Sequence, residues 1–418
     1  MAEIPAADEP PPTGAGQAER HTEALVIGAG PAGLAAAVML GREGVAVETL
    51  ERAAVVGASW RARYDALRLN SVRSISGLPG LALDRRFGRF VTRDDFVSYL
   101  DAYAARFRVD VHHGVAVHRL DAEPDGWRAS TSAGVWRAGA VVIATGYDHT
   151  PVIHLWPGRA SFEGELVHAA AYRSPGPYVG HDVLVIGSGS TGAELALDLA
   201  AGGARRVLLS VRTPPNLFPR EWLGVPLQAL SLLNRGTGRG GAPPLAVDAL
   251  GRFAQRLIHG DRAARLLGPA PLGIASAAAR GRTPVFADGL LDAIEAGAIE
   301  VVGAVESFAG PEVILTGGAR VRPSRVIAAT GYRRALEGLV GHLGVLDDHG
   351  LPLARSGDEV APGLSFIGYR LPHLAHVPAD ARRIARRVAR ATRQTRVGYQ
   401  NSRIQARRPL GATPKRVM

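Results

Sequence analysis

The chain has 418 residues, of which 46% are hydrophobic, so it is long enough to form two or three cores of ordinary domain size. It carries 49 Lys and Arg residues against 38 Asp and Glu residues, a formal net charge of +11 at neutral pH. It contains no cysteine. That composition excludes disulfide bonds, a thiol nucleophile, a redox cysteine pair, and zinc or iron–sulfur sites held by thiolates; no other metal site is expected.

Residues 1–21 are rich in Pro, Ala, Gly and acidic residues and have no apolar period, so we expect a disordered tail. The segment lacks the basic start and apolar core of a signal peptide. No stretch of the sequence reaches the roughly 18 unbroken apolar residues that a membrane span needs. We therefore expect a cytoplasmic protein with no membrane span.

From residue 22 the chain alternates β-branched runs with Ala/Leu-rich helical windows, the pattern of an α/β protein. The order strand, glycine turn, helix, strand occurs twice, over Ala24–Ile27, Leu34–Leu40 and Val45–Leu50, and over Val183–Ile186, Ala193–Ala200 and Val207–Val211. Strands are also predicted at Ala140–Ala144 and Arg325–Ala329, each leading into Ala-Thr-Gly-Tyr. A mostly helical stretch is predicted at about 216–283, with a flexible break at 235–244. We predict an α/β fold with two Rossmann-like dinucleotide-binding domains.

The first glycine turn has the spacing of a dinucleotide-binding loop, formed by Gly28, Gly30, Pro31, Ala32 and Gly33. Its first glycine permits the tight turn, the second lets the backbone approach a pyrophosphate, and the third lets the helix pack closely on the strand. An acid about 20 residues further on takes the ribose hydroxyls in such sites, and Glu48 and Glu51 compete for this role. Glu51 is preferred because it closes the strand, whereas Glu48 is expected to face solvent.

The second glycine turn is formed by Gly187, Ser188, Gly189, Ser190, Thr191 and Gly192. The strand after it leads into Arg212 and Thr213, so an arginine stands where the first unit has an acid. An acid would repel a 2′-phosphate, whereas Arg binds it through charge-assisted hydrogen bonds; the alternative for Arg212 is a solvated surface residue. The pair of loops predicts FAD at the first and NADPH at the second. Disulfide reductases share this layout, but they need the cysteine pair that this chain lacks.

Between the loops lies the pattern F-x-G-x-x-x-H-x-x-x-Y, formed by Phe162, Gly164, His168 and Tyr172. With this motif the sequence resembles the class B flavin-dependent monooxygenases, which carry it at the junction of their FAD and NADPH domains. The resemblance is closest in pattern to the indole-3-pyruvate monooxygenases of the YUCCA type and their bacterial relatives. Matching stretches lie at 50–52, 58–60, 64–69, 211–212, 218–221, 281–285 and 329–332.

The resemblance implies that an NADPH domain, residues 153–324 with the helical insertion, is inserted in an FAD domain formed by residues 22–152 and 325–392. It adds Arg52, Trp60 and Val115 to the expected FAD contacts, with core packing as the alternative for the tryptophan. It also implies a catalytic role for Asn70, near the flavin ring, where it would hydrogen-bond the oxygenated flavin or the substrate. A turn-forming asparagine is the alternative for Asn70.

Two departures from the family patterns bear on the substrate. Tyr172-Arg173 stands where the Baeyer–Villiger branch has Trp-Pro, which argues against a ketone-to-ester enzyme. Residues 69–73 (LNSVR) are closer to the Thr-Asn-x-x-Lys run of N- and S-oxygenating flavin monooxygenases than to the plant Leu-His-Leu-Pro-Lys. A soft N or S centre and a 2-oxo acid that is decarboxylated therefore both remain open as substrates.

By resemblance, NADPH reduces FAD, and reduced FAD reacts with O₂ to form a C4a-(hydro)peroxyflavin that oxygenates a small organic substrate. One alternative is an NAD(P)H:flavin oxidoreductase or oxidase without oxygen insertion, which does not predict the linker motif. Another is a non-catalytic dinucleotide-binding or redox-sensing protein, which the intact glycines of both loops disfavour. The expected partner is a small-molecule substrate, and a homodimer is left open.

The positive charge is concentrated at the end of the chain. Residues 381–418 contain eleven Arg and Lys415 and no acidic residue, which leaves 37 basic and 38 acidic residues, a net charge of −1, in the rest. Apolar residues at helical spacing over 381–388 predict a final helix that packs on the body. Residues 393–418 lose this period and are expected to form a disordered basic tail, with no specific nucleic acid as partner.

Overall fold

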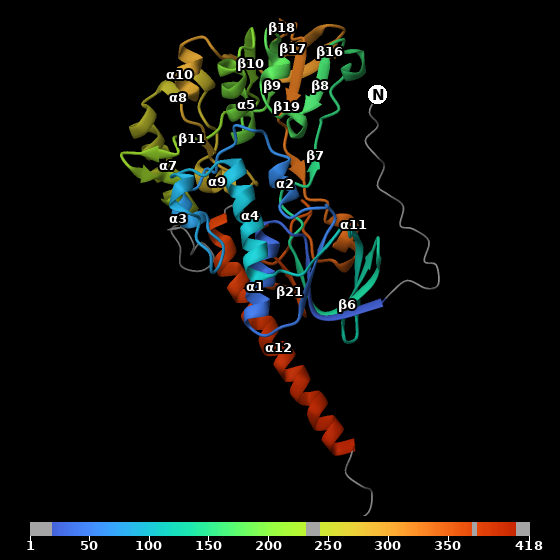
Figure 1. The fold of residues 1–418 in the computed structure, drawn as a ribbon. Helices are drawn as coiled ribbons and strands as arrows, with labels where there is room; N and C mark the ends of the chain where they lie inside the picture. The colour runs from blue at the N-terminus through green and yellow to red at the C-terminus, as the bar shows by residue number, and fades with distance from the viewer. Residues whose placement is uncertain (1–18, 231–242, 370–373, 407–418) are drawn as a thin grey trace, which may run out of the picture.

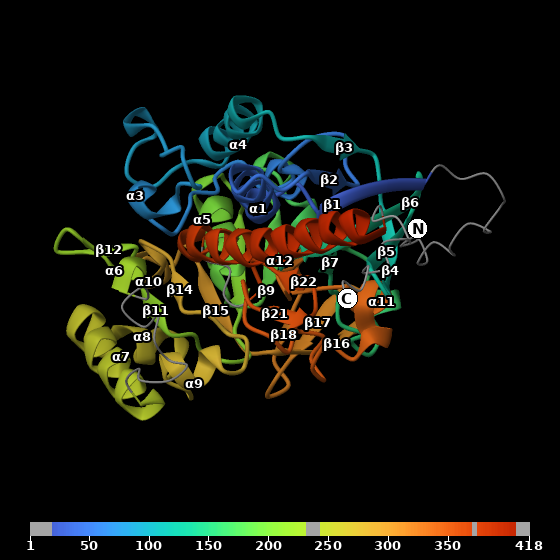
Figure 2. The same ribbon diagram turned by 90° about the horizontal axis from the view of Figure 1, so that it is seen from below.

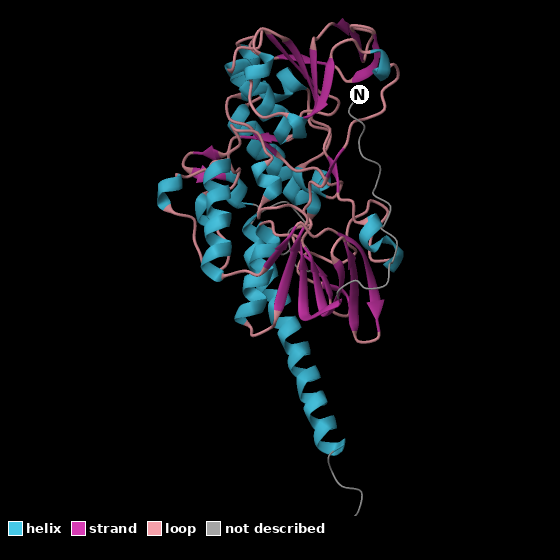
Figure 3. Cartoon of the chain, turned by 45° about the vertical axis from the view of Figure 1, so that its right-hand side comes forward, coloured by secondary structure: helices cyan, strands magenta, loops and turns pink. Residues whose placement is uncertain are grey.

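The computed structural model describes residues 19–230, 243–369 and 374–406. They form two sheet-containing units that lie one above the other in Figure 1, with the long helix α12 (Val377–Ala406) extending below them. The sheets and the helices that cover them are separated by colour in Figure 3. The architecture confirms the predicted α/β fold class.

The first sheet has the strand order β21-β22-β6-β1-β2-β3, and the hairpin β4–β5 joins it through β6. Alternate residues of β1 point to opposite faces, so Val26 packs with α1, α4 and α12 while Leu25 packs with the hairpin and α11. Both faces are thus buried, which explains the continuous apolar run of the central strand. The bounds are β1 Glu19–Ile27, β2 Val47–Glu51, β3 Val111–His113, β4 Val117–Glu123, β5 Gly126–Thr131, β6 Gly134–Ile143, β21 Glu359–Ala361, β22 Leu364–Phe366, α1 Pro31–Arg42, α2 Ala58–Arg61, α3 Arg73–Ser76, α4 Arg93–Phe107 and α11 Glu337–Val340.

The second sheet has the order β15-β10-β9-β19-β8, and all of its strand pairs are parallel. Helix α5 packs on one face, and the antiparallel sheet β16-β17-β18 packs on the other. The bounds are β8 Glu165–His168, β9 Asp182–Ile186, α5 Ser190–Ala201, β10 Arg206–Ser210, α10 Leu290–Glu295, β15 Glu300–Val302, β16 Val305–Ala309, β17 Glu312–Leu315, β18 Arg320–Val321 and β19 Arg325–Ala328.

The stretch that was predicted to be mostly helical, at about 216–283, contains four helices and short strand pairs in its described residues. The strands β11 and β14 pair in parallel and bracket it, and β12 and β13 form a small hairpin. The part of the predicted break from 235 to 242 lies outside the described residues. The bounds are β11 Leu217–Phe218, β12 Glu221–Trp222, β13 Val225–Pro226, α6 Leu227–Leu230, α7 Pro244–His259, α8 Arg262–Leu267, α9 Ile274–Ala278 and β14 Val285–Phe286.

The disordered tails predicted at residues 1–21 and 393–418 are too long, because each includes residues that belong to a strand or a helix. Glu19–His21 already belong to β1, where they pair with β6 through the backbone ladder, an interaction that leaves no apolar pattern; residues 1–18 lie outside the described part. Helix α12 does carry the predicted buried stripe, with Ala381 and Ile384 fully buried beside α1 (Figure 2). However, it continues to Ala406, because a helix nucleated by docking propagates through residues of ordinary helix propensity.

The predicted return to the first domain at residue 325 is also wrong. β19 pairs with β8 and β9, so it belongs to the second sheet. The chain crosses back only after it, where β20 (Tyr332–Arg333) pairs antiparallel with β7 (Thr150–Pro151). Ala-Thr-Gly-Tyr follows a central strand in both units, and this repetition concealed which sheet each copy completes. No helix in the described ranges is both long enough and apolar enough to span a bilayer.

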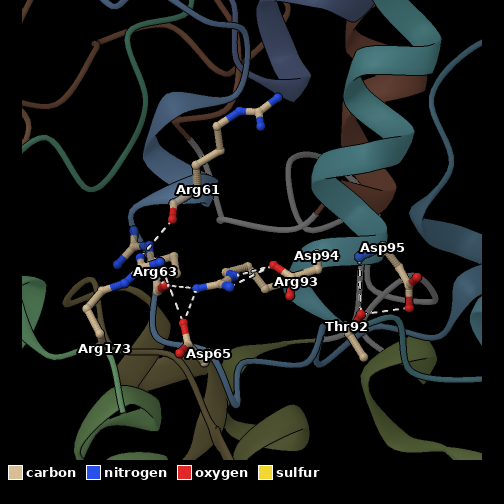
Figure 4. Close-up of polar contacts among 8 residues, drawn as sticks. All are labelled: Arg61, Arg63, Asp65, Thr92, Arg93, Asp94, Asp95 and Arg173. Atoms are coloured by element: carbon tan, nitrogen blue, oxygen red, sulfur yellow. Dashed lines mark hydrogen bonds and ion pairs between the residues drawn. The ribbon is translucent and has the colours of Figure 1, made fainter.

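A cluster of arginines joins the segment after β8 to the first unit (Figure 4). Arg173 Nη1 donates to the carbonyl oxygens of Arg61 and Arg63, at 2.7 and 2.6 Å. Arg93, at the start of α4, donates to the same Arg63 carbonyl at 2.6 Å and to Asp65 Oδ1 at 2.6 Å. The Asp65 N–H in turn donates to the Arg173 carbonyl at 2.8 Å. This cluster fixes the loop at 61–65 against the connection between the two units.

We expect Arg93→Met to lower the free energy of unfolding by about 1–2 kcal/mol, because it removes the hydrogen bonds of a buried donor. The loss is limited because Asp65 and Asp94 are exposed and stay hydrated without the arginine. Thermal denaturation measures the effect as a loss of a few degrees in Tm. The matched control is Arg85→Met, at an exposed arginine. Equal Tm values for the two variants would contradict the role given to Arg93.

Candidate functional site

The first glycine loop joins β1 to α1, and its three glycines differ in their surroundings. Gly28 has a φ of +104°, and a Cβ there would lie 2.6 Å from the carbonyl oxygen of Ala144. A Cβ on Gly33 would lie 1.8 Å from the Gly28 carbonyl oxygen, whereas one on Gly30 would meet no atom within 4 Å. Helix α1 begins at Pro31, and no side chain caps it. The loop is therefore tightly packed toward the sheet and open at its middle glycine.

The second loop, between β9 and α5, repeats this geometry. Gly187 has a φ of +114°, and a Cβ there would lie 2.6 Å from the carbonyl oxygen of Ala329. A Cβ on Gly192 would lie 1.8 Å from the Gly187 carbonyl oxygen, while Gly189 faces open space. Ser190 begins α5 without a side-chain cap, with Thr191 next in its first turn. The two Ala-Thr-Gly-Tyr segments thus act alike, since each begins with the alanine whose carbonyl packs on the loop's first glycine.

The two acids of β2 have different environments. Glu51 Oε2 accepts a hydrogen bond from the Ala29 N–H at 2.7 Å, and Oε1 accepts one from the Ala53 N–H at 2.9 Å. Glu51 therefore lies against the first glycine loop. Glu48 accepts a hydrogen bond from Trp136 Nε1 at 2.8 Å and lies 3.0 Å from His112 Nε2. The expectation that Glu48 faces solvent was wrong, because two neighbouring aromatic residues supply polar partners that the β2 sequence does not show.

The other expected FAD contacts surround the same loop unevenly. Ala32 is half-buried in the first turn of α1, within van der Waals range of a Cβ built at Gly368. Val115 is buried, and its N–H donates to the Glu51 carbonyl at 3.0 Å. Trp60 packs edge-to-face on Phe96, with ring centroids 4.6 Å apart. Arg52 is exposed.

A cavity of about 360 Å³ opens beside the second loop, at the carboxyl ends of β9, β10 and β19. Its lining brings together Gly187, Ser188 and Gly189 of the loop with the predicted Arg212 and Thr213. Ser188 Oγ donates to the Thr213 carbonyl at 3.2 Å, which ties the loop to the end of β10. Arg212 therefore lines this cavity, and it is also exposed to solvent.

The same cavity is also lined by residues that the sequence did not indicate as binding residues, among them His154, Trp156, Asn216 and Arg282. Burial and the positive charge of Arg212 both lower the pKa of His154, so its neutral form is favoured beside that guanidinium. Arg282 lies in 281–285, one of the stretches that carried the family resemblance, and this resemblance could have indicated it as a binding residue. His154 and Trp156 had no comparable signal, because they reach the cavity from the connection that follows β7.

Three side chains of the linker motif fasten the segment around β8 to the rest of the second unit, and its glycine leaves room for one of them. The Phe162 ring packs on Phe308 with centroids 5.2 Å apart, and a Cβ on Gly164 would lie 2.6 Å from that Phe162 ring. His168 Nδ1 accepts from the Ala170 N–H at 3.0 Å, so its Nε2 carries the proton and donates to the Gly331 carbonyl at 3.0 Å. Tyr172 Oη donates to Asp198 Oδ2 of α5 at 2.7 Å. The histidine therefore holds the second Ala-Thr-Gly-Tyr segment directly.

Asn70 belongs to the first unit, and its contacts lie in the second. Its Oδ1 accepts a hydrogen bond from Arg220 Nε at 3.0 Å. Arg220 also donates to Glu194 Oε1 of α5 at 3.1 Å and to Asp288 Oδ2 at 3.1 Å. Tyr64 Oη donates to the other oxygen of Glu194. The sequence singled out Asn70 but not Glu194 or Asp288, which come from elements far away along the chain.

The arrangement fits two dinucleotides. Each loop has an open glycine and an uncapped helix N-terminus, which together favour a pyrophosphate. At the first loop a carboxylate with unused lone pairs suits ribose hydroxyls. At the second, Arg212 and Arg282 line one cavity and suit the additional phosphate of NADPH. No cluster of three or more metal-ligating side chains occurs in the ranges that the structure covers.

Comparison with known proteins agrees with this geometry. The family described as pyridine nucleotide-disulphide oxidoreductase matches residues 25–219, the part that contains both loops. The chain is 33% identical over 379 residues to a protein named indole-3-pyruvate monooxygenase YUCCA1 from Oryza sativa subsp. japonica, covering 87% of this chain and 90% of that protein.

Solved structures show the same fold. A flavin-containing monooxygenase from Stenotrophomonas maltophilia is similar with a TM-score of 0.68 at 23% identity, covering 89% of this chain and 99% of that one. S-allyl-L-cysteine S-oxygenase from Allium sativum is similar with a TM-score of 0.60 at 19% identity, covering 94% and 84%. Electron transfer through a cysteine pair, as in disulfide reductases, is excluded by composition. The chain therefore belongs to the class B flavin-dependent monooxygenases and is an enzyme that uses FAD, NADPH and O₂.

Proposed function

We propose that the first unit binds FAD and that the second, inserted unit binds NADPH. The observation that carries this assignment is the contrast at the two loops of otherwise equal geometry, where one has Glu51 against its backbone and the other has Arg212 on its cavity. An acid disfavours a 2′-phosphate and an arginine favours it. The FAD-binding domain would comprise residues 19–152 and the described residues after β19.

In the first unit, Gly30 and the first turn of α1 would hold the FAD pyrophosphate. Glu51 would take the ribose hydroxyls with the lone pairs that its bonds to Ala29 and Ala53 leave unused. Those two bonds orient the carboxylate before the cofactor binds. Trp60 and Val115 would border the cofactor, and the exposed Arg52 would lie at its edge.

In the second unit, Ser188 and Gly189 would contact the NADPH pyrophosphate at the start of α5, and Arg212 with Thr213 would contact the 2′-phosphate. Phe162, Gly164, His168 and Tyr172 would act indirectly, by fixing the segment whose alanine packs on the second loop. When bound, the two cofactors supply hydride transfer and the activation of O₂. The protein's contribution is to orient them and to exclude water.

For the substrate, the sequence identity over most of the chain favours a 2-oxo acid, such as indole-3-pyruvate. With O₂, NADPH and a proton it would give the shortened carboxylic acid, CO₂, NADP⁺ and water. The chain's own Asn70, in place of the plant histidine, favours a second candidate, oxygenation of an amine or thioether. These two candidates give products of different mass.

Purified protein reconstituted with FAD should consume NADPH and O₂ and convert indole-3-pyruvate to indole-3-acetate, detected by mass spectrometry. Parallel reactions with an aromatic amine and a thioether test the second candidate. NADPH oxidation that yields only hydrogen peroxide with all three substrate classes would count against both substrate proposals.

Arg212→Ala should weaken NADPH binding by about ten- to a hundredfold and leave NADH binding nearly unchanged, because only NADPH carries the 2′-phosphate that this guanidinium would bind. The dissociation constants are measured by titrating both nucleotides against the FAD-loaded protein. NADH serves as the internal control. A parallel loss of affinity for both nucleotides would show that Arg212 supports the loop rather than the phosphate.

His168 should make stability depend on pH. Burial and nearby Arg63 lower its pKa, so the folded state holds it neutral, and its stabilising contribution is complete above the unfolded pKa of about 6.5. As pH falls below that value, the unfolded state gains the proton first and stability declines. Each unit of pKa difference is worth about 1.4 kcal/mol.

The measurement is Tm between about pH 7.5 and pH 5, compared with His168→Gln, which retains a donor and an acceptor but cannot be protonated in this range. The variant should lose less Tm on acidification than the natural protein does. Identical pH profiles would assign the acid sensitivity to other groups, such as His149, His154 or His259, whose pKa values burial also lowers.

A further inference from the structure

Arg220 is a buried cation at the junction of the two units. Its side chain is 15% exposed and that of Glu194 is 11% exposed, so this ion pair is largely removed from water. Arg220 follows β11, Glu194 lies on α5 just after the second glycine loop, and the Asn70 amide comes from the first unit. A buried guanidinium persists only where its hydrogen bonds are satisfied.

The contacts of Arg220 use separate donors. Nε donates to Asn70 Oδ1 at 3.0 Å, Nη2 to Glu194 Oε1 at 3.1 Å, and Nη1 to Asp288 Oδ2 at 3.1 Å. The Arg220 main-chain N–H also donates to Asp288 Oδ1 at 2.9 Å. Two carboxylates therefore fix the plane of the guanidinium, and Nε faces Asn70 in consequence.

This contact decides which way the Asn70 amide faces. Arginine has donors only, so the atom that meets Nε must be the amide oxygen and not the amide nitrogen. Rotation of the amide by 180° would bring two donors together beside a buried cation. The Nδ2 group, with its two hydrogens, is thereby held on the side away from Nε.

Glu194 is held by hydrogen bonds from Arg220 and Tyr64 to its two oxygens. The pKa of this carboxyl is raised, because burial outweighs the charge of Arg220 and the hydrogen bonds that lower it. The Asn70 amide joins this network through its oxygen, which accepts from Arg220 Nε. The four side chains thus form one network that links the first unit to α5.

We propose that Arg220 is a positioning residue for Asn70: it holds the amide oxygen, so that the Nδ2 group is turned to donate to the bound flavin or substrate. The inference rests on the proposed function, since it needs Asn70 to contact one of these groups. It assigns Glu194 and Asp288 the task of orienting Arg220. Because Glu194 lies on α5, the orientation of Asn70 depends on the two units being assembled.

The experiment is a double-mutant cycle with Arg220→Lys, Asn70→Ala and the double variant, all loaded with FAD. Lys retains the positive charge near Glu194, but its single nitrogen cannot take the separate places of Nε, Nη1 and Nη2, so it cannot keep all three contacts. The first readout is coupling, the ratio of oxygenated product to NADPH consumed, with hydrogen peroxide measured in parallel. The second is the visible absorption band of the bound oxidised flavin, which reports its hydrogen bonds without turnover.

We expect each single variant to lower coupling by about fivefold or more, and the double variant to be no worse than Asn70→Ala alone. Arg220→Lys and Asn70→Ala should change the flavin band in the same direction. Asp288→Asn, at a half-exposed acid, should cause a smaller loss of coupling with Tm nearly unchanged. If Arg220→Lys folds poorly, Asp288→Asn still tests the proposal, because it disturbs the orientation of Arg220 without changing that residue. Arg205→Lys, at an exposed ion pair, is the matched control and should behave as the natural protein.

Additive losses in the double variant would overturn the proposal, since Arg220 would then act independently of Asn70. Natural coupling in both Arg220→Lys and Asp288→Asn would overturn it as well. Failure of the proposed function is distinguishable, because the natural protein itself would then give no oxygenated product.

Discussion

Both units depend on a contact that only glycine allows. In each, the first glycine of the loop lies so close to the carbonyl oxygen of an alanine at the end of a neighbouring strand that a Cβ would stand 2.6 Å from it. Two strand ends and a helix N-terminus therefore converge on one point, with the open middle glycine facing outward. This close approach positions, without any side chain, the backbone that we propose binds the cofactor pyrophosphates.

The alanine that makes this contact begins a segment that also joins the units. After Ala329, the Gly331 carbonyl accepts the hydrogen bond from His168, and Tyr332 accepts one from Arg63 of the first unit at 3.1 Å. Arg63 also pairs with Asp148, which follows the corresponding segment of the first unit, at 2.8 Å. The second loop and the inter-unit junction are thus connected through one segment, and His168 of the linker motif is among the residues that hold it.

Much of this could be predicted from the sequence, since it depends on local pattern. Glycine spacing, buried apolar runs and the stripe of α12 indicated the loops, the strands and the docked helix. What the sequence could not show depends on contacts between distant segments. Glu48 accepts a hydrogen bond from Trp136, which lies 88 positions away. β19 belongs to the second sheet, whereas the first was expected. Arg220 contacts Asn70, which lies 150 positions away. Polar contacts between residues so far apart produce no periodic pattern in the sequence, so they could not be predicted from it.

The first sheet contains strands from both ends of the described chain: β22 pairs with β6, α12 packs on α1, and Arg396 of α12 contacts Glu23 of β1 at 2.6 Å. The second sheet, by contrast, has all five of its strands once Arg325–Ala328 has been made. On the ribosome, where domains fold as they emerge, the inserted unit is therefore the first to be complete. The first unit, which starts with β1, is complete only when β22 and α12 have also been made, and the edge of β6 that pairs with β22 stays unpaired in the interval.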